Sequence, residues 1–139
     1  MKHFILPFLL ACTVAGCATP SRDASPALAP YLAHAGEPVS QFHYFGRAMG
    51  WQRIDDGHVV LDVKPRESWL LRISGPCLDW DSGAATLGLT SRNGVVVARF
   101  DQVLVKGSPI GCRIEEIRPL DMKALRDARN APAAQPSGT

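Results

Sequence analysis

The chain has 139 residues, of which 46% are hydrophobic and 20% are charged, and its formal net charge is +2. This composition is typical of one globular domain and excludes a chain that is disordered throughout. The charge excess is too small to indicate a nucleic-acid-binding surface. The sequence holds no phosphate-loop, dinucleotide-binding or zinc-ligand motif. We therefore expect no cofactor and no metal, and the sequence assigns no reaction.

The first residues follow the order of a bacterial signal peptide. Lys2 makes the start of the chain positive, and residues 4–14 are mostly apolar and carry no charge. A membrane-spanning helix takes about 20 apolar residues, so this run is too short to cross a bilayer and fits the apolar core of a signal peptide. We predict that residues 1–16 are a signal peptide that is removed.

The apolar run ends in Val-Ala-Gly-Cys at residues 14–17, a string that resembles the lipobox of bacterial lipoproteins. Small side chains let a peptidase approach the backbone, and the thiol of Cys17 accepts the lipid. Two acyl chains already anchor a protein stably, so the membrane is the first expected partner. Ala18 stands where an aspartate would retain the protein at the inner membrane under the enterobacterial sorting rule. We expect a lipoprotein of the cell envelope, anchored to the outer membrane and facing the periplasm.

Two other ways of processing the chain fit less well. Leu-Leu-Ala-Cys at residues 9–12 also resembles a lipobox, but it leaves an apolar run of only about six residues, whereas signal peptides have 7–15. Cleavage after Ala18 would instead release a soluble periplasmic protein.

The mature chain begins with a segment that differs in composition from the rest. Residues 17–29 comprise the lipidated cysteine and a stretch rich in Ala, Ser and Pro, which predicts a flexible tether. Leu28, Tyr31 and Leu32 recur at helical spacing, and Gly36 follows as a stop signal. This predicts a short helix near residues 30–35, with Pro30 in its first turn. A single domain is expected over residues 30–130.

Between Val39 and Leu120 the pattern is typical of β-strands. Asn93-Gly94 separates two apolar runs, the second of them over residues 95–100, and predicts a tight hairpin. Two other runs alternate so that three apolar side chains of each share one face: Val59, Leu61 and Val63 in the first, and Trp69, Leu71 and Ile73 in the second.

The last strand and the end of the chain carry distinct signals. Cys112 and Ile114 share a face but Ile117 is out of phase, which predicts a bulge near residues 115–116. Pro119 is expected to end the strand, and Asp121 to cap a helix over residues 122–129. Residues 131–139 are expected to be a disordered tail. The predicted fold is mainly β, a small antiparallel barrel or sandwich of six to seven strands with a short helix at each end.

The mature chain keeps two cysteines besides the lipidated one. Cys12 leaves with the signal peptide, so Cys77 and Cys112 remain, an even pair in an exported chain. A disulfide is expected between them, and two buried free thiols are the alternative. A metal site is not indicated because neither cysteine has a second cysteine or histidine at ligand spacing.

Few residues suggest chemistry. Asp79 and Asp81 flank Trp80 on one side of an extended segment, so they would bind a cation or act as an acid–base pair with a histidine, or else form a solvated loop beside Cys77. His58 is expected to be a solvent-facing turn residue. Most aromatic side chains are expected in the core, with Tyr44 and Trp80 as candidates for an exposed binding patch.

Three strings are similar to a known family: Leu-Ala-Pro-Tyr-Leu-Ala-His-Ala-Gly at residues 28–36, Phe-Asp-Gln-Val at 100–103, and Cys-Arg-Ile-x-x-Ile-Arg-Pro-Leu-Asp at 112–121. They resemble small proteobacterial, Xanthomonas-type lipoproteins that form a domain of unknown function, over roughly residues 5–127. The resemblance implies a lipid-anchored envelope protein and transfers no catalytic residue.

The sequence therefore favours a non-catalytic binding or structural module in the periplasm. Its partner would be an envelope protein or a small molecule, and no nucleic acid. The alternative is a small periplasmic enzyme or metal-binding protein that uses Asp79, Asp81 and a histidine.

Overall fold

The computed structural model describes residues 25–75, 86–106, 108 and 110–132. These residues form two helices and eight strands in the order α1 (Ala29–Ala33), β1 (Gln41–His43), β2 (Gly50–Asp55), β3 (His58–Lys64), β4 (Glu67–Ile73), β5 (Leu87–Leu89), β6 (Val95–Val97), β7 (Gln102–Val105), β8 (Cys112–Leu120) and α2 (Met122–Asn130).

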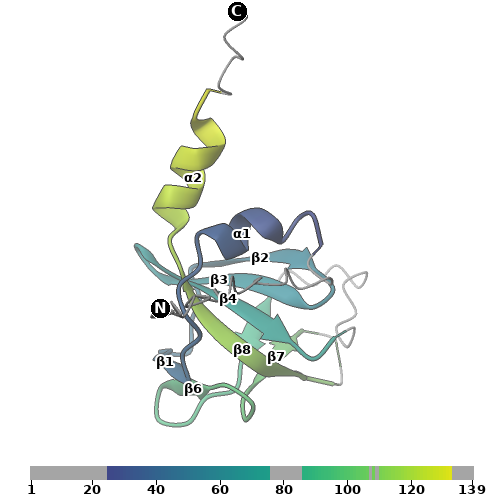
Figure 1. Ribbon diagram of the computed structural model, residues 1–139. Helices are drawn as coiled ribbons and strands as arrows, with labels where there is room; N and C mark the ends of the chain where they lie inside the picture. Colours follow the sequence, from purple (N-terminus) through teal and green to yellow (C-terminus); the bar gives the residue numbers. More distant parts are fainter. Residues whose placement is uncertain (1–24, 76–85, 107, 109, 133–139) are drawn as a thin grey trace, which may run out of the picture.

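Six strands form one curled antiparallel sheet, and two short strands form a second. The large sheet has the order β2-β3-β4-β8-β7-β5 and the shape of a half-barrel, whereas β1 pairs with β6. In Figure 1, α1 lies across β2, β3 and β4, and α2 rises from the end of β8. The predicted mainly β fold is confirmed. The structure has eight strands where six to seven were predicted, and two of the eight form the separate small sheet.

The centre of the large sheet, at β3 and β4, is buried on both faces. Val59, Leu61, Leu71 and Ile73 point into the half-barrel, as their alternation predicted, and Trp69 packs against the same core while remaining half-buried. The other face holds a second core under the two helices, made of Leu28, Tyr31, Val60, Leu70, Leu120 and Leu125. Strands buried on both faces read as near-continuous apolar runs, which accounts for the unbroken apolar letters at residues 59–61.

The Asn93-Gly94 turn before β6 forms, but the predicted hairpin was wrong, because β5 pairs with β7 and β6 pairs with β1. The strand after the turn is also shorter than predicted. Asn93 and Gly94 take φ values of 52° and 74°, and Arg92 pairs with Val95 across them. The chain then turns away after Val97, whose backbone N–H donates to Asp101 Oδ2 at 2.8 Å. Residues 98–100 therefore leave the sheet.

The predicted bulge in β8 is present. Arg72 pairs with Glu116 and Ile73 pairs with Ile114, so Glu115 is the additional residue. This extra residue brings Ile114 and Ile117 to the same core, where both are fully buried. One prediction about β8 was wrong, because Pro119 does not end the strand. Proline lacks an N–H, but its carbonyl accepts from the N–H of Gly36 at 2.8 Å, and β8 continues to Leu120.

Both helices form near the predicted positions. The side chain of Asp121 caps α2 by accepting from the N–H of Ala124 at 2.8 Å, and Leu125 is buried beneath the helix. Helix α1 has Pro30 in its first turn, as predicted. The predicted tether extends too far, however, because Leu28 is only 2% exposed and belongs to the outer core. No helix within the described ranges is long and apolar enough to span a bilayer.

Candidate functional site

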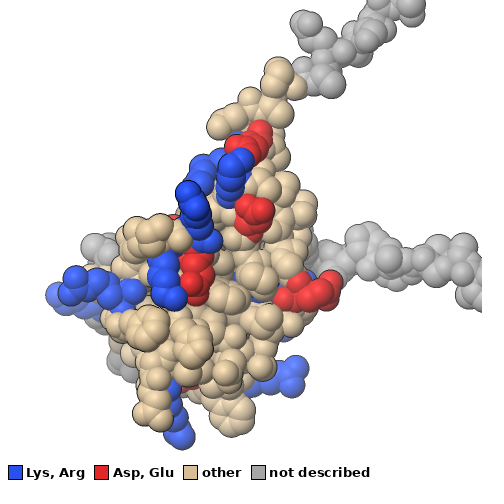
Figure 2. All heavy atoms as spheres, turned by 90° about the vertical axis from the view of Figure 1, so that its left-hand side faces the viewer, with Lys and Arg blue, Asp and Glu red and all other residues tan. Residues whose placement is uncertain are grey.

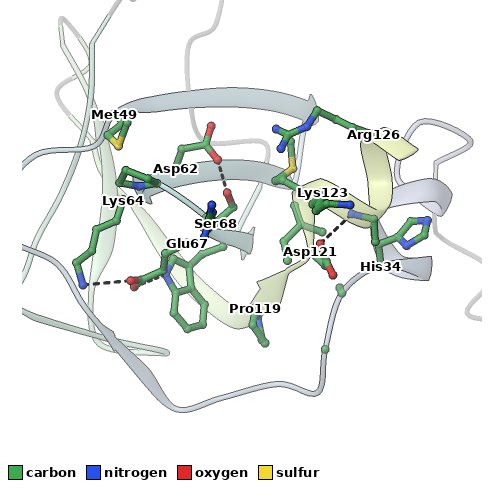
Figure 3. A pocket seen from close by; sticks show the side chains of 18 of the residues that line it. His34, Met49, Asp62, Lys64, Glu67, Ser68, Pro119, Asp121, Lys123 and Arg126 are labelled. Atoms are coloured by element: carbon green, nitrogen blue, oxygen red, sulfur yellow. Dashed lines mark hydrogen bonds and ion pairs between the residues drawn. The ribbon is translucent and has the colours of Figure 1, made fainter. Parts of the chain in front are cut away.

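A groove of about 1090 Å³ lies between α2, the end of α1 and the turn that joins β3 to β4 (Figure 3). Three features of the chain create it. Asp121 starts α2 directly after β8, so the helix projects from the sheet. The β3–β4 turn, in which Arg66 takes a φ of 68°, forms the side of the groove opposite α2. The end of α1, at His34, closes one side.

The floor of the groove holds a paired carboxylate and hydroxyl. Asp62 and Ser68 are partners across the β3–β4 hairpin, and the Ser68 hydroxyl donates to Asp62 Oδ1. Ser68 is buried, while the Asp62 carboxylate lies at the floor, as Figure 3 shows. The hydroxyl of Ser68 replaces a hydrogen bond that the Asp62 carboxylate would otherwise make to water. This hydrogen bond holds the carboxylate in one orientation.

On the β3–β4 side of the groove, hydrogen bonds connect a lysine, a glutamate and a tryptophan side chain. Glu67 accepts from Lys64 Nζ at 3.1 Å with one oxygen and from Trp69 Nε1 at 3.2 Å with the other. The indole of Trp69 stacks on Phe42, with ring centroids 4.9 Å apart. Lys64 also lies over the ring of Phe45, 5.3 Å from its centroid. Because each group has a partner, this wall is ordered before any ligand arrives.

The opposite wall comes from α2. Lys123 Nζ lies 2.6 Å from Asp127 Oδ2, and the hydrogen bond to this carboxylate raises the pKa of the Lys123 ammonium. Arg126 and, across the groove, Arg66 carry no ion pair with another described residue. Figure 2 shows that lysine and arginine side chains gather on this face over α2 and beside it, with acidic side chains between them. The groove therefore presents both positive and negative side chains, together with apolar surface and the indole of Trp69.

A second polar cluster lies at the β2–β3 turn. Asp55 accepts from Ser25 Oγ at 2.7 Å and from the N–H of Gly57 at 2.9 Å, and its other contact is His58 Nδ1 at 2.8 Å. Burial alone would raise the pKa of Asp55, but the hydrogen bonds from Ser25, His58 and Gly57 outweigh it and hold that pKa below its usual value.

This cluster has the residue types of a hydrolytic triad without its geometry. A nucleophilic serine needs an imidazole beside its hydroxyl, whereas here Asp55 stands between Ser25 and His58. The cluster instead fastens the segment before α1 to the sheet. The prediction of a solvent-facing His58 was wrong in this respect, since its side chain is 17% exposed and bound to Asp55.

Tyr44 does not belong to an exposed binding patch. It is 3% exposed and packs in the inner core, where burial raises the pKa of its hydroxyl. Among the described residues, the exposed phenylalanines are Phe45, at 74%, and Phe100, at 83%. The two-residue period of β1 continues past its end, so Phe42 and Tyr44 face inward and Phe45 faces outward. This alternation in the sequence could have identified Phe45 as the exposed aromatic residue, but the sequence analysis assigned that position to Tyr44.

Several predicted site residues lie outside the described residues. They are Cys17, Cys77, Asp79, Trp80 and Asp81, together with most of the predicted tail. Cys112 is described and is fully buried in the inner core at the start of β8. Within the described ranges, no three His, Cys, Asp or Glu side chains come together as a metal site would require.

Sequence reasoning did not find the groove. Asp62, Ser68 and Glu67 are ordinary polar positions on two strands, and only the register of the hairpin brings them together. Lys123 and Arg126 come from an element 50 residues or more further along the chain, and nothing local relates them to β3.

A family model covers residues 1–136, and the chain belongs to that family, DUF6491, a family of unknown function. No curated protein and no solved structure matches the chain.

Proposed function

We propose that this member of DUF6491 is a lipid-anchored lipoprotein of the bacterial envelope whose β domain binds a small molecule or an envelope protein, and does not catalyse a reaction. The anchor is supported by the Val-Ala-Gly-Cys string at residues 14–17, directly after an uncharged apolar run. The observation that carries the binding role is the groove beside α2.

The groove has the size and the mixed chemistry of a binding site. Its volume of about 1090 Å³ is at the upper end of ligand pockets, which span about 300–1,000 Å³. Apolar surface from Met49, Trp69 and Met122 lies beside the free guanidinium groups of Arg66 and Arg126. Such a lining suits a ligand with an apolar body and an anionic group, because arginine binds carboxylates and phosphates in a fixed fork geometry.

The bonding of the groove's carboxylates supports binding over catalysis. Asp62 accepts from Ser68, Glu67 from Lys64 and Trp69, and Asp121 from the backbone of α2. A general acid or base must be free to exchange a proton with substrate at working pH. Carboxylates that already accept hydrogen bonds from the protein are less suited to that role and well suited to shaping a site.

A second candidate function rests on the place where the chain leaves β4. An added Cβ at Gly75 would lie 2.5 Å from the carbonyl oxygen of Asp56, so the chain passes directly beside the turn that carries His58. Residues 79 and 81 follow shortly afterwards. We therefore retain as the alternative a periplasmic enzyme or metal-binding protein that uses Asp79, Asp81 and a histidine. Titration of Zn²⁺ or Ca²⁺ into the wild type and into the variant with Asp79→Asn and Asp81→Asn separates the two functions.

The anchor is tested with two cysteine variants that differ only in position. Cys17→Ser is expected to abolish incorporation of a fatty-acid label and release the protein from membranes. Cys12→Ser is expected to leave both unchanged, because residue 12 leaves with the signal peptide. Loss of labelling in Cys12→Ser alone would show that the earlier cysteine is lipidated. Label-free mature protein that begins at residue 19 would show ordinary cleavage.

The binding role is tested by photo-crosslinking in intact cells. A photoreactive amino acid placed at Arg126, inside the groove, is expected to capture a defined species that the same amino acid at Lys106, directly after β7, does not capture. Asp62→Asn in the first variant should weaken that product, because it alters the groove floor. Identical products from both positions would contradict a groove-specific ligand.

A further inference from the structure

The largest exposed apolar side chains of the described β1–β4 region lie together at one end of the sheet. Phe45 is 74% exposed and Met49 is 67% exposed, and both belong to the segment between β1 and β2. The β3–β4 turn lies against this segment, since Lys64 sits 5.3 Å from the Phe45 ring centroid and the N–H of Met49 donates to the carbonyl of Asp62 at 2.7 Å. We call Phe45, Arg47, Met49, Lys64 and Arg66 the tip surface.

The tip surface is cationic as well as apolar. Its two segments, residues 44–49 and 64–67, carry the three cations Arg47, Lys64 and Arg66 and the single anion Glu67. All three cations are exposed, and Lys64 lies over the exposed ring of Phe45. An aromatic ring with lysine and arginine around it is the composition of protein surfaces that rest in the headgroup region of an anionic bilayer.

The chain geometry allows this end of the molecule to reach a membrane that holds Cys17. Ser25 is fixed to Asp55 at the β2–β3 turn, and β3 runs from that turn to the tip over a distance of about 20 Å. The eight residue steps from Cys17 to Ser25 span at most about 29 Å. A lipid at Cys17 therefore permits the tip surface to touch the same bilayer, and it raises the local concentration of lipid around the tip.

From these observations we infer that the tip surface is a second membrane contact, which inserts Phe45 and Met49 between the headgroups of an anionic bilayer and places Arg47, Lys64 and Arg66 against lipid phosphates. The inference rests on the proposed lipid anchor for its role in the cell, because the tip alone is a small surface. It also explains why a large apolar ring stays exposed next to a cation.

The test uses the mature chain from Ala18 to Thr139, which has no lipid. It keeps every buried core residue of the described ranges, from Leu28 to Leu125. Binding is measured by co-sedimentation with vesicles of equal parts phosphatidylglycerol and phosphatidylcholine, and with vesicles of phosphatidylcholine alone. We expect binding to the anionic vesicles, weakening with added salt, and little binding to the neutral ones. Because this chain lacks Cys17, the result does not depend on whether that residue is lipidated.

Matched variants locate the contact. Phe45→Ala is expected to weaken anionic-vesicle binding about tenfold, since burying a phenylalanine side chain is worth that much or more. Phe100→Ala, at an equally exposed ring outside the tip surface, should leave binding unchanged. Arg66→Glu should weaken binding and reduce its salt dependence, whereas Lys106→Glu should not. The circular dichroism of each variant confirms that it is folded.

Three results with a binding wild type would overturn the inference. They are equal binding to neutral and anionic vesicles, wild-type binding by Phe45→Ala, and a loss in Phe100→Ala as large as that in Phe45→Ala. Absence of vesicle binding by the wild type would also overturn it and would assign the tip surface to a protein partner.

Discussion

At the scale of single residues, the carboxylate of Asp55 makes hydrogen bonds whose contribution to stability depends on pH. It joins Ser25, His58 and the turn backbone, and these hydrogen bonds lower its pKa in the folded state. A carboxyl whose folded pKa lies below its unfolded pKa stabilises the fold at every pH above the unfolded value, about 3.9 for Asp. That stabilisation is lost as the pH falls through the folded pKa.

We therefore predict that Asp55→Asn lowers the free energy of unfolding by about 1–2 kcal/mol at neutral pH. The difference between wild type and variant should shrink as the pH falls from about 4 through the lower folded pKa of Asp55, because protonation then removes the stabilisation that the ionised carboxyl supplies. Urea unfolding at a series of pH values measures this. Asp127→Asn, at an exposed helix position, is the control and should cost little at any pH. A pH-independent difference would contradict the prediction.

Gly94 is the second residue whose role is local. Its φ of 74° is costly for a residue with a Cβ, and an added Cβ would lie 3.5 Å from the carbonyl oxygen of Tyr44, an ordinary contact. The backbone conformation is thus the main obstacle to substitution.

We expect Gly94→Ala to lower the free energy of unfolding by about 1 kcal/mol. Gly88→Ala is the matched control, because Gly88 has no positive φ and an added Cβ there would meet nothing within 4 Å. That variant should be neutral or slightly stabilising. Thermal unfolding of the two variants compares them directly, and equal destabilisation would show that strand packing, not turn geometry, is responsible.

At the scale of secondary-structure elements, α2 is held chiefly by Leu125, with Met122 partly buried against the same outer core. Leu125 is 1% exposed, while residues 126–130 are all exposed. Helices this short are not stable alone, so packing of Leu125 in the outer core holds the helix and with it one wall of the groove.

Leu125→Ala is predicted to cost about 2–4 kcal/mol of stability, as buried leucine truncations do. Because the helix is terminal, part of this loss should appear as local opening of α2, detected as faster amide hydrogen exchange over residues 122–130 than over β3 and β4. Asn130→Ala, in the exposed last turn, is the control. Uniform acceleration of exchange throughout the sheet would show that α2 is part of the global unfolding unit.

At the scale of the whole molecule, the predicted Cys77–Cys112 disulfide would join the end of the β2–β4 meander to the start of β8. Cys112 is fully buried in the inner core, and Cys77 lies outside the described residues. Closing a loop of this length restricts the unfolded chain by about 3–4 kcal/mol in the entropy model. This is a large share of the roughly 5–15 kcal/mol that stabilises a domain.

Intact mass after alkylation without reduction, on protein isolated from the periplasmic side, is expected to show neither cysteine modified. Reduction should then lower the melting temperature by about 10–20 °C, at roughly 3–6 °C per kcal/mol for a domain of this size. Alkylation of both cysteines before reduction would contradict the prediction.

Much of the strand pattern followed from sequence because its causes are local. Alternation placed Val59, Leu61 and Val63 on one face, Asn93-Gly94 supplied a positive-φ turn, and the phase break at Ile117 required the bulge at Glu115. Each depends on residues within a few positions of one another, where backbone sterics and side-chain period decide the outcome.

The two faces of the sheet and the groove were decided only by tertiary structure. Val60 and Leu70 are buried because α1 and α2 cover them, and no signal near residue 60 announces a helix that begins at residue 122. Tyr44 is in the core and Phe45 is outside because the small β1–β6 sheet sets which face is interior. The groove joins Asp62 and Ser68, set by hairpin register, to Lys123 and Arg126 on a distant helix. Such contacts form between segments far apart in the chain, where packing and not local propensity selects the partner.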